Sequence, residues 1–191
     1  MSSSIHCFIG LGNPGEKYVN TRHNAGAWFV DHLAAAHHLT FKLDKKLHGH
    51  IVEWPCDTHK VLLFKPITYM NDSGRAVAAF TKFYKIPSEA MLVAHDELDF
   101  EPGIARLKKG GGHGGHNGLR DLIDCLNTSD FYRLRIGIGH PGVRDDVSDY
   151  VLHKPSVADL AKITQSLEAA ITVTPALVVG EIQSAFHSLH S

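Results

Sequence analysis

The segment Ile5-His-Cys-Phe-Ile-Gly-Leu-Gly-Asn-Pro-Gly15 begins with a short apolar run and ends in glycines. A run of this kind predicts a buried strand that enters a tight turn. Similar apolar runs at 61–64, 91–94 and 134–138 predict further buried strands. Pro66 stops the run at 61–64 shortly after its end.

The remaining segments carry helical or half-buried strand patterns. Apolar side chains recur at helical spacing over 24–39 and 73–84, and Ser73 or Asn71 can cap the second helix. We also expect half-buried strands at 50–54 and 104–108, a helix at 119–126, and one or two helices at 157–189, interrupted near Pro175 and Gly180. Strands that alternate with helices predict one α/β domain over residues 1–191, with an at least partly parallel sheet covered by helices.

The composition is that of an ordinary globular protein. Of 191 residues, 43% are hydrophobic and 20% charged, and no apolar stretch reaches the roughly eighteen residues of a membrane helix. The first residues lack the pattern of a secretory signal. Cys7, Cys56 and Cys125 form no CxxC pair, which predicts reduced thiols and a cytoplasmic location. The net charge of −1 means that any RNA contact must come from a local basic patch.

Polar side chains follow the ends of the predicted buried strands. Asn13 follows the first strand, Asn71 comes shortly after the second, and Asp96 follows the third. Ligand sites of open α/β sheets gather beyond the carboxyl ends of parallel strands. Each residue alone is typical of a turn, but the three together predict a site at this edge of the sheet.

The first glycine cluster matches GxGxxG at 10–15, a pattern found in dinucleotide-binding proteins. In those proteins a helix starts within the glycine loop, whereas here Pro14 and the polar stretch 16–22 delay it. The acidic residue expected at the end of a second strand is also missing, since Asp31 falls inside a predicted helix. The context therefore argues against a dinucleotide.

The second glycine cluster spans Gly110 to Gly118 and must form a loop. It lacks the Gly-Lys-Ser/Thr end of a phosphate-binding P-loop. Lys108 and Lys109 precede it and Asn117 begins a predicted helix, so a phosphate can lie alongside. The alternative is a flexible surface loop without a ligand.

Two common hydrolytic motifs, GxSxG and HExxH, are absent from the sequence. His113 and His116 are three residues apart, but a glycine loop does not hold them rigidly for zinc, so we expect no metal. His23 and Asp96 remain as a general base and its orienting partner, a pair that can activate water directly. The residues alone do not identify the substrate.

Several long motifs resemble the signature segments of bacterial peptidyl-tRNA hydrolases. They are Gly10-Leu-Gly-Asn-Pro-Gly15, Tyr18, Thr21-Arg-His-Asn24 and the glycine cluster at 110–118, with further similarity at 66–71, 94–98 and 133–142. The resemblance covers about Ile5 to Pro155. It implies a twisted, mixed, largely parallel sheet flanked by helices. It also implies a monomer without metal or cofactor that hydrolyses the ester between a peptide and the 3′ ribose of its tRNA, so that the tRNA can be reused.

The resemblance also implies roles for individual residues. His23 matches the base that activates water, Asp96 matches its partner, and Asn13 matches a catalytic amide. Substrate contacts are implied for Tyr18, Met70, Asn71, His116 and Asn117, with Met70 in the peptide groove and His116 near the tRNA 3′ end. Lys108 and Arg135 match residues that clamp the 5′ phosphate of the acceptor stem.

One feature departs from the family pattern. Family members usually carry Lys or Arg in a C-terminal helix, but Lys162 is the last Lys or Arg of this chain, and Glu181 and His187 occupy the region. Whether this helix contacts tRNA stays open. Two alternatives also stay open: a non-catalytic RNA-binding protein that uses Lys108 and Arg135, and a dinucleotide-dependent oxidoreductase that uses the first glycine loop.

Overall fold

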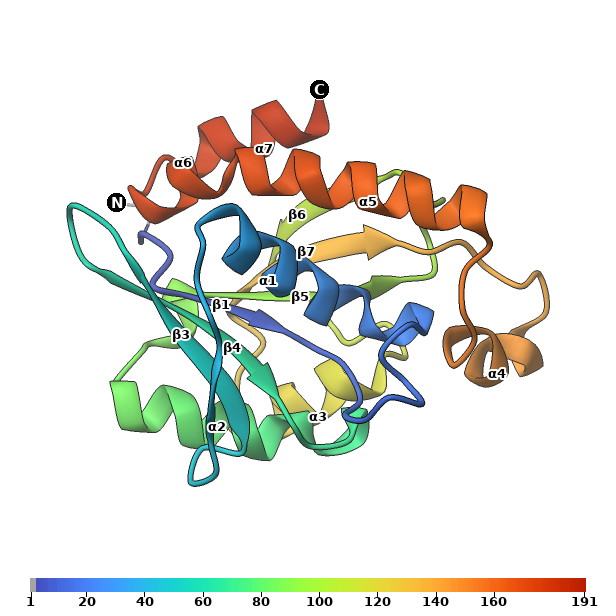
Figure 1. Ribbon diagram of the computed structural model, residues 1–191, viewed down its shortest axis with the longest axis horizontal. Helices are drawn as coiled ribbons and strands as arrows, with labels where there is room; N and C mark the ends of the chain where they lie inside the picture. The colour runs from blue at the N-terminus through green and yellow to red at the C-terminus, as the bar shows by residue number, and fades with distance from the viewer. Residues whose placement is uncertain (1–2) are drawn as a thin grey trace.

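The strands form a seven-stranded sheet in the order β2-β3-β4-β1-β5-β7-β6 in the computed structural model, which describes residues 3–191 (Figure 1). The strands are β1 (Cys7–Gly10), β2 (Lys42–Asp44), β3 (Gly49–Pro55), β4 (Lys60–Pro66), β5 (Met91–Glu97), β6 (Ala105–Lys109) and β7 (Tyr132–Gly137). The four central strands β4, β1, β5 and β7 run parallel, and the outer strands pair antiparallel. The expected mixed, largely parallel sheet is confirmed.

Helices cover both faces of the sheet (Figure 1). They are α1 (Ala25–Ala36), α2 (Ser73–Tyr84), α3 (Asn117–Leu126), α4 (Val147–Val151), α5 (Val157–Thr172), α6 (Thr174–Val178) and α7 (Ile182–His190). Short 3-10 turns are η1 (Arg22–Asn24), η2 (Met70–Asp72), η3 (Ser88–Ala90) and η4 (Arg144–Asp146). Within residues 3–191, no helix has the length and apolar character needed to span a membrane.

The core lies on both sides of the sheet because strand side chains alternate between its faces. Phe8 of β1 packs with α1 and the C-terminal helices α5 to α7, whereas Cys7 and Ile9 pack with α2 and α3. All three side chains are fully buried. A strand buried on both faces explains why the first segment of the chain is a continuous apolar run.

The pattern-based predictions located most elements but not all of their ends. The C-terminal segment forms three helices instead of one or two, and β2 and α4 were not predicted. The predicted caps of α2 were wrong, because Asp72 is the N-cap residue and its side chain makes no capping bond. Instead Gly74 N–H donates to Asp121 Oδ2 of α3 at 2.7 Å. Tertiary packing thus replaces a local cap.

Gly10 and Gly26 allow α1 to approach the sheet closely. A Cβ on Gly26 would lie 2.1 Å from the Ala94 carbonyl oxygen, and one on Gly10 would lie 2.4 Å from the Gly26 carbonyl oxygen. Only glycine tolerates such contacts. The start of α1 therefore sits directly against β1 and β5, and η1 is held over the end of β5.

Candidate active site

A cavity of about 1370 Å³ opens at the carboxyl ends of the parallel strands. All the residues predicted for the site line it: Asn13, Tyr18, His23, Met70, Asn71, Asp96, Lys108, His116, Asn117 and Arg135. They come from loops and elements spread over more than a hundred residues of sequence. The expectation that polar residues at the strand ends meet at one edge of the sheet is confirmed.

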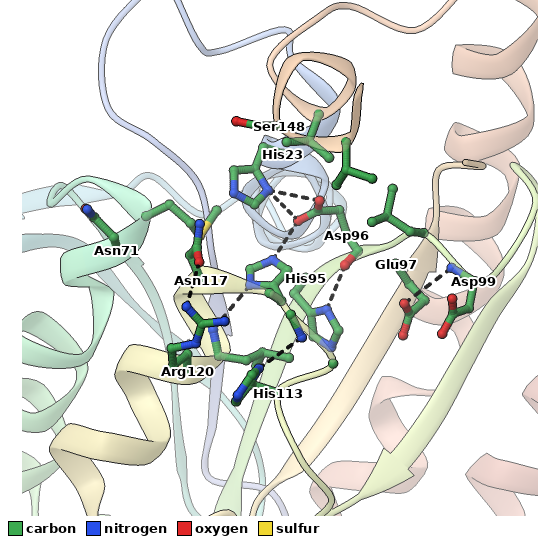
Figure 2. A pocket seen from close by; sticks show the side chains of 18 of the residues that line it. His23, Asn71, His95, Asp96, Glu97, Asp99, His113, Asn117, Arg120 and Ser148 are labelled. Carbon is green, nitrogen blue, oxygen red and sulfur yellow. Dashed lines mark hydrogen bonds and ion pairs between the residues drawn. The ribbon is translucent and has the colours of Figure 1, made fainter. Parts of the chain in front are cut away.

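His23 and Asp96 form a buried pair at the centre of the cavity (Figure 2). His23 lies in η1, and Asp96 lies within β5 instead of following it. Nδ1 of His23 is 3.0 Å from Oδ1 and 2.9 Å from Oδ2 of Asp96. His23 is 9% exposed and Asp96 4% exposed, so water screens the pair weakly.

His116 binds the same carboxylate, a contact that was not predicted. Its Nε2 lies 2.8 Å from Asp96 Oδ1, while its Nδ1 accepts the backbone N–H of Leu119 at 3.2 Å as the N-cap of α3. Because Nδ1 is an acceptor, the ring proton sits on Nε2 and is donated to Asp96. Asp96 therefore accepts from two histidines.

This network also determines the tautomer of His23. An ionised carboxylate only accepts, so Nδ1 of His23 carries the proton that it donates to Asp96. In neutral His23, Nε2 is then left with a free lone pair. A neutral imidazole with one anchored N–H and one free nitrogen is the arrangement that a general base requires.

The burial and charges of this cluster shift its pKa values. Burial disfavours the charged form of Asp96, but the attraction of His23 and His116 outweighs it and holds the pKa of Asp96 far below its usual range. Burial likewise disfavours the His23 imidazolium, yet the charge and hydrogen bond of Asp96 raise the pKa of His23 above its ordinary value. Burial, aided by the nearby His116, lowers the pKa of His95 to about 3. His95 is therefore neutral.

The side-chain amide of Asn13 has a defined orientation. Its Oδ1 accepts the backbone N–H of Met70 at 2.7 Å. Its backbone N–H donates to Asn24 Oδ1 at 2.9 Å, and Asn24 Nδ2 donates back to the Asn13 carbonyl at 3.0 Å. With Oδ1 engaged, the Nδ2 group of Asn13 remains to donate into the cavity that it lines.

Four other predicted residues surround this centre. Met70 is buried, and Gly118 makes room for it, because a Cβ on Gly118 would lie 2.5 Å from Met70 Sδ. Tyr18 and Tyr69 meet edge to face with their ring centroids 6.3 Å apart. Asn71 and Asn117 are both exposed, and in Figure 2 they lie on the opposite side of the site from Glu97 and Asp99.

Two arginines of β7 reach the cavity in different ways. Arg135 donates from Nε to Glu97 Oε1 at 2.7 Å. Arg133, which was not singled out in the sequence, donates from its two Nη atoms to the carbonyls of Gly112 and Gly111 at 2.5 and 2.6 Å. The second glycine cluster is thus a loop tied to the sheet. An alternation of basic residues over 133–135 is the only sequence signal that could have indicated this role.

One wall of the cavity was missed by sequence reasoning because α4, with five residues, is too short to show a helical periodicity. Its residues Val147, Ser148 and Val151 line the cavity, and Figure 2 shows Ser148 beside His23. Arg22 ties this wall to η1: its Nη1 donates to the Tyr150 carbonyl at 3.0 Å, and its guanidinium lies 3.9 Å from the centroid of the Tyr150 ring.

His23, Asp96 and His116 bring three potential metal-ligand atoms within 4.8 Å of one another. Sequence reasoning considered His113 with His116, so the triad that the fold assembles is a different one. For His116 to bind a metal through Nε2, its neutral ring would carry a proton on Nδ1, facing the Leu119 N–H that it now accepts. The hydrogen bonds in the structure suit two histidines that donate to one carboxylate better than they suit a metal site.

Comparisons with known proteins agree with this geometry. A sequence model described as "Peptidyl-tRNA hydrolase" matches residues 7–191. A peptidyl-tRNA hydrolase from Coxiella burnetii (strain CbuK_Q154) is 50% identical over 191 residues, covering 100% of both chains. One from Pseudoalteromonas translucida is 50% identical, covering 99% of this chain and 98% of its own. The crystal structure of peptidyl-tRNA hydrolase from Acinetobacter baumannii superimposes with a TM-score of 0.95 at 47% identity, covering 99% of this chain and 96% of that one.

Proposed function

The chain belongs to the peptidyl-tRNA hydrolase family, whose function is the hydrolysis of peptidyl-tRNA, and from this premise we propose that His23 is the general base of that reaction. The observation that carries the proposal is the pair of contacts from Asp96 to His23 and His116. They leave Nε2 of His23, which lines the cavity, free to accept a proton. A dinucleotide-dependent oxidoreductase is not supported, because α1 begins only at Ala25, after the glycine loop, and Asp31 pairs with Lys65 at 2.6 Å.

In the proposed reaction, Nε2 of His23 takes a proton from water as the water oxygen adds to the ester carbonyl carbon. Asp96 stabilises the imidazolium that forms. The tetrahedral intermediate then collapses, the bond from the carbonyl carbon to the ribose 3′ oxygen breaks, and the imidazolium returns its proton to that oxygen. The products are tRNA with a free 3′ hydroxyl and the peptide, whose new carboxyl group releases its proton to solvent as a carboxylate.

Amide donors stabilise the developing oxyanion in this proposal. Asn13 has its oxygen engaged by Met70, which leaves its Nδ2 group to donate. Asn71 and Asn117 position substrate and water, Met70 and Tyr18 line the peptide groove, and His116 stands near the tRNA 3′ end. Side-chain amides supply hydrogen bonds without adding charge, which suits an ester that is already activated. We therefore propose that the reaction needs no metal.

Lys108 and Arg135 form the proposed clamp for the tRNA 5′ phosphate. Both line the cavity at its β6–β7 side, on neighbouring strands. Backbone phosphate contacts position the acceptor stem without reading its base sequence. We propose that the protein acts as a monomer in the cytoplasm, where reduced cysteines persist.

The decisive experiment is hydrolysis of an N-acylated aminoacyl-tRNA by the purified protein in a strong chelator. We expect release of free tRNA and acylated amino acid. A protein that binds tRNA without cleaving it would instead be the non-catalytic RNA-binding alternative. Activity that appears only with added zinc would contradict the metal-free part of the proposal alone.

A further inference from the structure

The guanidinium of Arg135 is supported on two sides by the protein itself. Its Nε donates to Oε1 of Glu97 at 2.7 Å, and its central carbon lies 4.5 Å from the centroid of the Phe100 ring. The side chains of Arg135 and Glu97 are 23% and 18% exposed, so solvent screens the pair only in part. One edge and one face of the guanidinium are therefore in fixed contacts.

These contacts leave the outer edge of Arg135 available. A guanidinium has N–H donors on Nε and on both Nη atoms, and its planar edges suit bidentate binding of phosphate. Glu97 takes the donor on Nε. Among the interactions described for residues 3–191, neither Nη atom of Arg135 has a hydrogen-bond acceptor or a carboxylate partner.

Arg133 differs from Arg135 in that both of its Nη atoms already donate to the protein. It projects from the same face of β7, two residues earlier, and both of its Nη atoms donate to glycine-loop carbonyls. Lys108 is its register partner on β6, and its Nζ lies against the loop, 2.8 Å from where a Cβ on Gly111 would be. Of the two arginines, Arg135 is the one with terminal donors left for a ligand beside Lys108.

We infer that Glu97 is a positioning residue for recognition of the tRNA 5′ phosphate, holding Arg135 against Phe100 so that its Nη donors face the phosphate. This inference rests on the proposed clamp. The opposite role is that of a competitor, an anion that occupies Arg135 until phosphate displaces it. Loss of a positioning residue weakens phosphate recognition, whereas loss of a competitor strengthens it.

The test compares peptidyl-tRNA that carries its 5′ phosphate with the same tRNA after phosphatase treatment. The readout is the ratio of kcat/KM for the two substrates. We expect Glu97→Ala to lower this ratio roughly three- to tenfold, the scale of one charge-assisted hydrogen bond, through KM for the phosphorylated substrate. Glu97→Gln keeps an acceptor oxygen and should preserve most of the ratio. Asp99→Asn is the control, because it removes one exposed carboxylate without touching Arg135.

Phe100→Leu provides a second route if Glu97→Ala does not fold, and it should lower the ratio in the same direction. An unchanged or increased ratio in Glu97→Ala, or in Phe100→Leu if the first variant cannot be measured, would overturn the inference. A ratio near one in the wild-type protein is a distinct outcome, because it would mean that the 5′ phosphate does not contribute to recognition. The proposed phosphate clamp would then be wrong, and the inference about Glu97 with it. Hydrolysis of both substrates would then still support the proposed hydrolase activity.

Discussion

Asp96 Oδ1 lies 2.8 Å from Nε2 of His116, a ring that accepts the Leu119 N–H on its other nitrogen. His116 is therefore a donor to Asp96 in its neutral form. The carboxylate that orients His23 is itself held by a second histidine from the start of α3. The glycine loop, which ends at His116, therefore contributes directly to the environment of His23.

His23→Ala should lower turnover by roughly two to four orders of magnitude, the usual contribution of a general base. Binding of tRNA should change little, because its phosphate contacts are assigned to Lys108 and Arg135 and not to His23. Single-turnover kinetics together with a tRNA-binding assay check this. His187→Ala, at an exposed position on α7, is the control. Near-normal turnover in His23→Ala would end the assignment.

Asp96→Asn should keep the fold but reduce activity sharply. In Asp96→Asn one carboxylate oxygen becomes an NH2 donor, which favours an acceptor nitrogen on the ring that faces it, so the wrong tautomer of His23 becomes favoured. We expect a modest change in Tm. If Asp96 were only structural, Tm would fall strongly and the folded fraction would remain active, which melting curves paired with kinetics distinguish.

The pH dependence of kcat/KM should report the environment of His23. A base must be neutral, so activity is lost as the pH falls through the pKa of His23, which is raised above 6.5. In Asp96→Asn the attraction that raises this pKa is gone while burial, which lowers it, remains. The acid limb should therefore move to lower pH. Profiles of kcat/KM from about pH 5 to about pH 9 for the wild type and Asp96→Asn test this. An acid limb at the same pH in both proteins would contradict the prediction.

Asn13→Asp should lower kcat roughly a hundred- to a thousandfold, the usual effect of losing one oxyanion donor. The variant keeps the oxygen that accepts Met70 N–H but replaces the donating amide by a carboxylate oxygen. The exposed Asn20 provides a matched control in Asn20→Asp. A variant with an unchanged kcat and a raised KM would assign Asn13 to substrate binding instead.

Extended dialysis against a strong chelator should leave activity intact. His23, Asp96 and His116 are close enough to bind a metal, but the Leu119 N–H on His116 opposes the tautomer that a metal would require. Metal analysis of the dialysed protein accompanies the assay. Activity that disappears and returns with zinc would point to a metal site, formed either by this triad or by His113 with His116.

The affinity for tRNA should depend only weakly on salt. With a net charge of −1, few phosphate contacts are available, and the slope of log K against log salt is about −0.7 to −0.9 per contact. We expect a slope equivalent to about two to four contacts, and a shallower one in Lys108→Ala or Arg135→Ala. These variants should raise KM for full-length substrate but cleave a short peptidyl-adenosine normally. If Arg135→Ala impaired the hydrolysis of both substrates equally, Arg135 would have a structural role in its ion pair with Glu97 and no role in phosphate binding.

Local patterns in the sequence were sufficient for the fold class. The apolar run at Cys7–Gly10 and the helical spacing over Ser73–Tyr84 identify elements because periodicity and burial are properties of contiguous residues. Two further predictions also came from contiguous residues. The glycine run at 110–118 predicted a loop, and Pro14 with the polar stretch 16–22 indicated that no helix starts within the first glycine cluster. The motifs also named His23 and Asp96 as candidates, and their resemblance to a family supplied the substrate.

Only the tertiary structure decided how these residues are connected. His23 and His116 lie 73 and 20 residues from the carboxylate that they share, and Glu97 meets Arg135 across two strands whose pairing is not local. Contacts between distant segments depend on strand register and on the close approach of α1 to β5, which no short-range pattern encodes. The sequence by itself therefore determined which groups are available for the chemistry. The packing of α1, β5 and α3 decided which nitrogen of His23 is free to act.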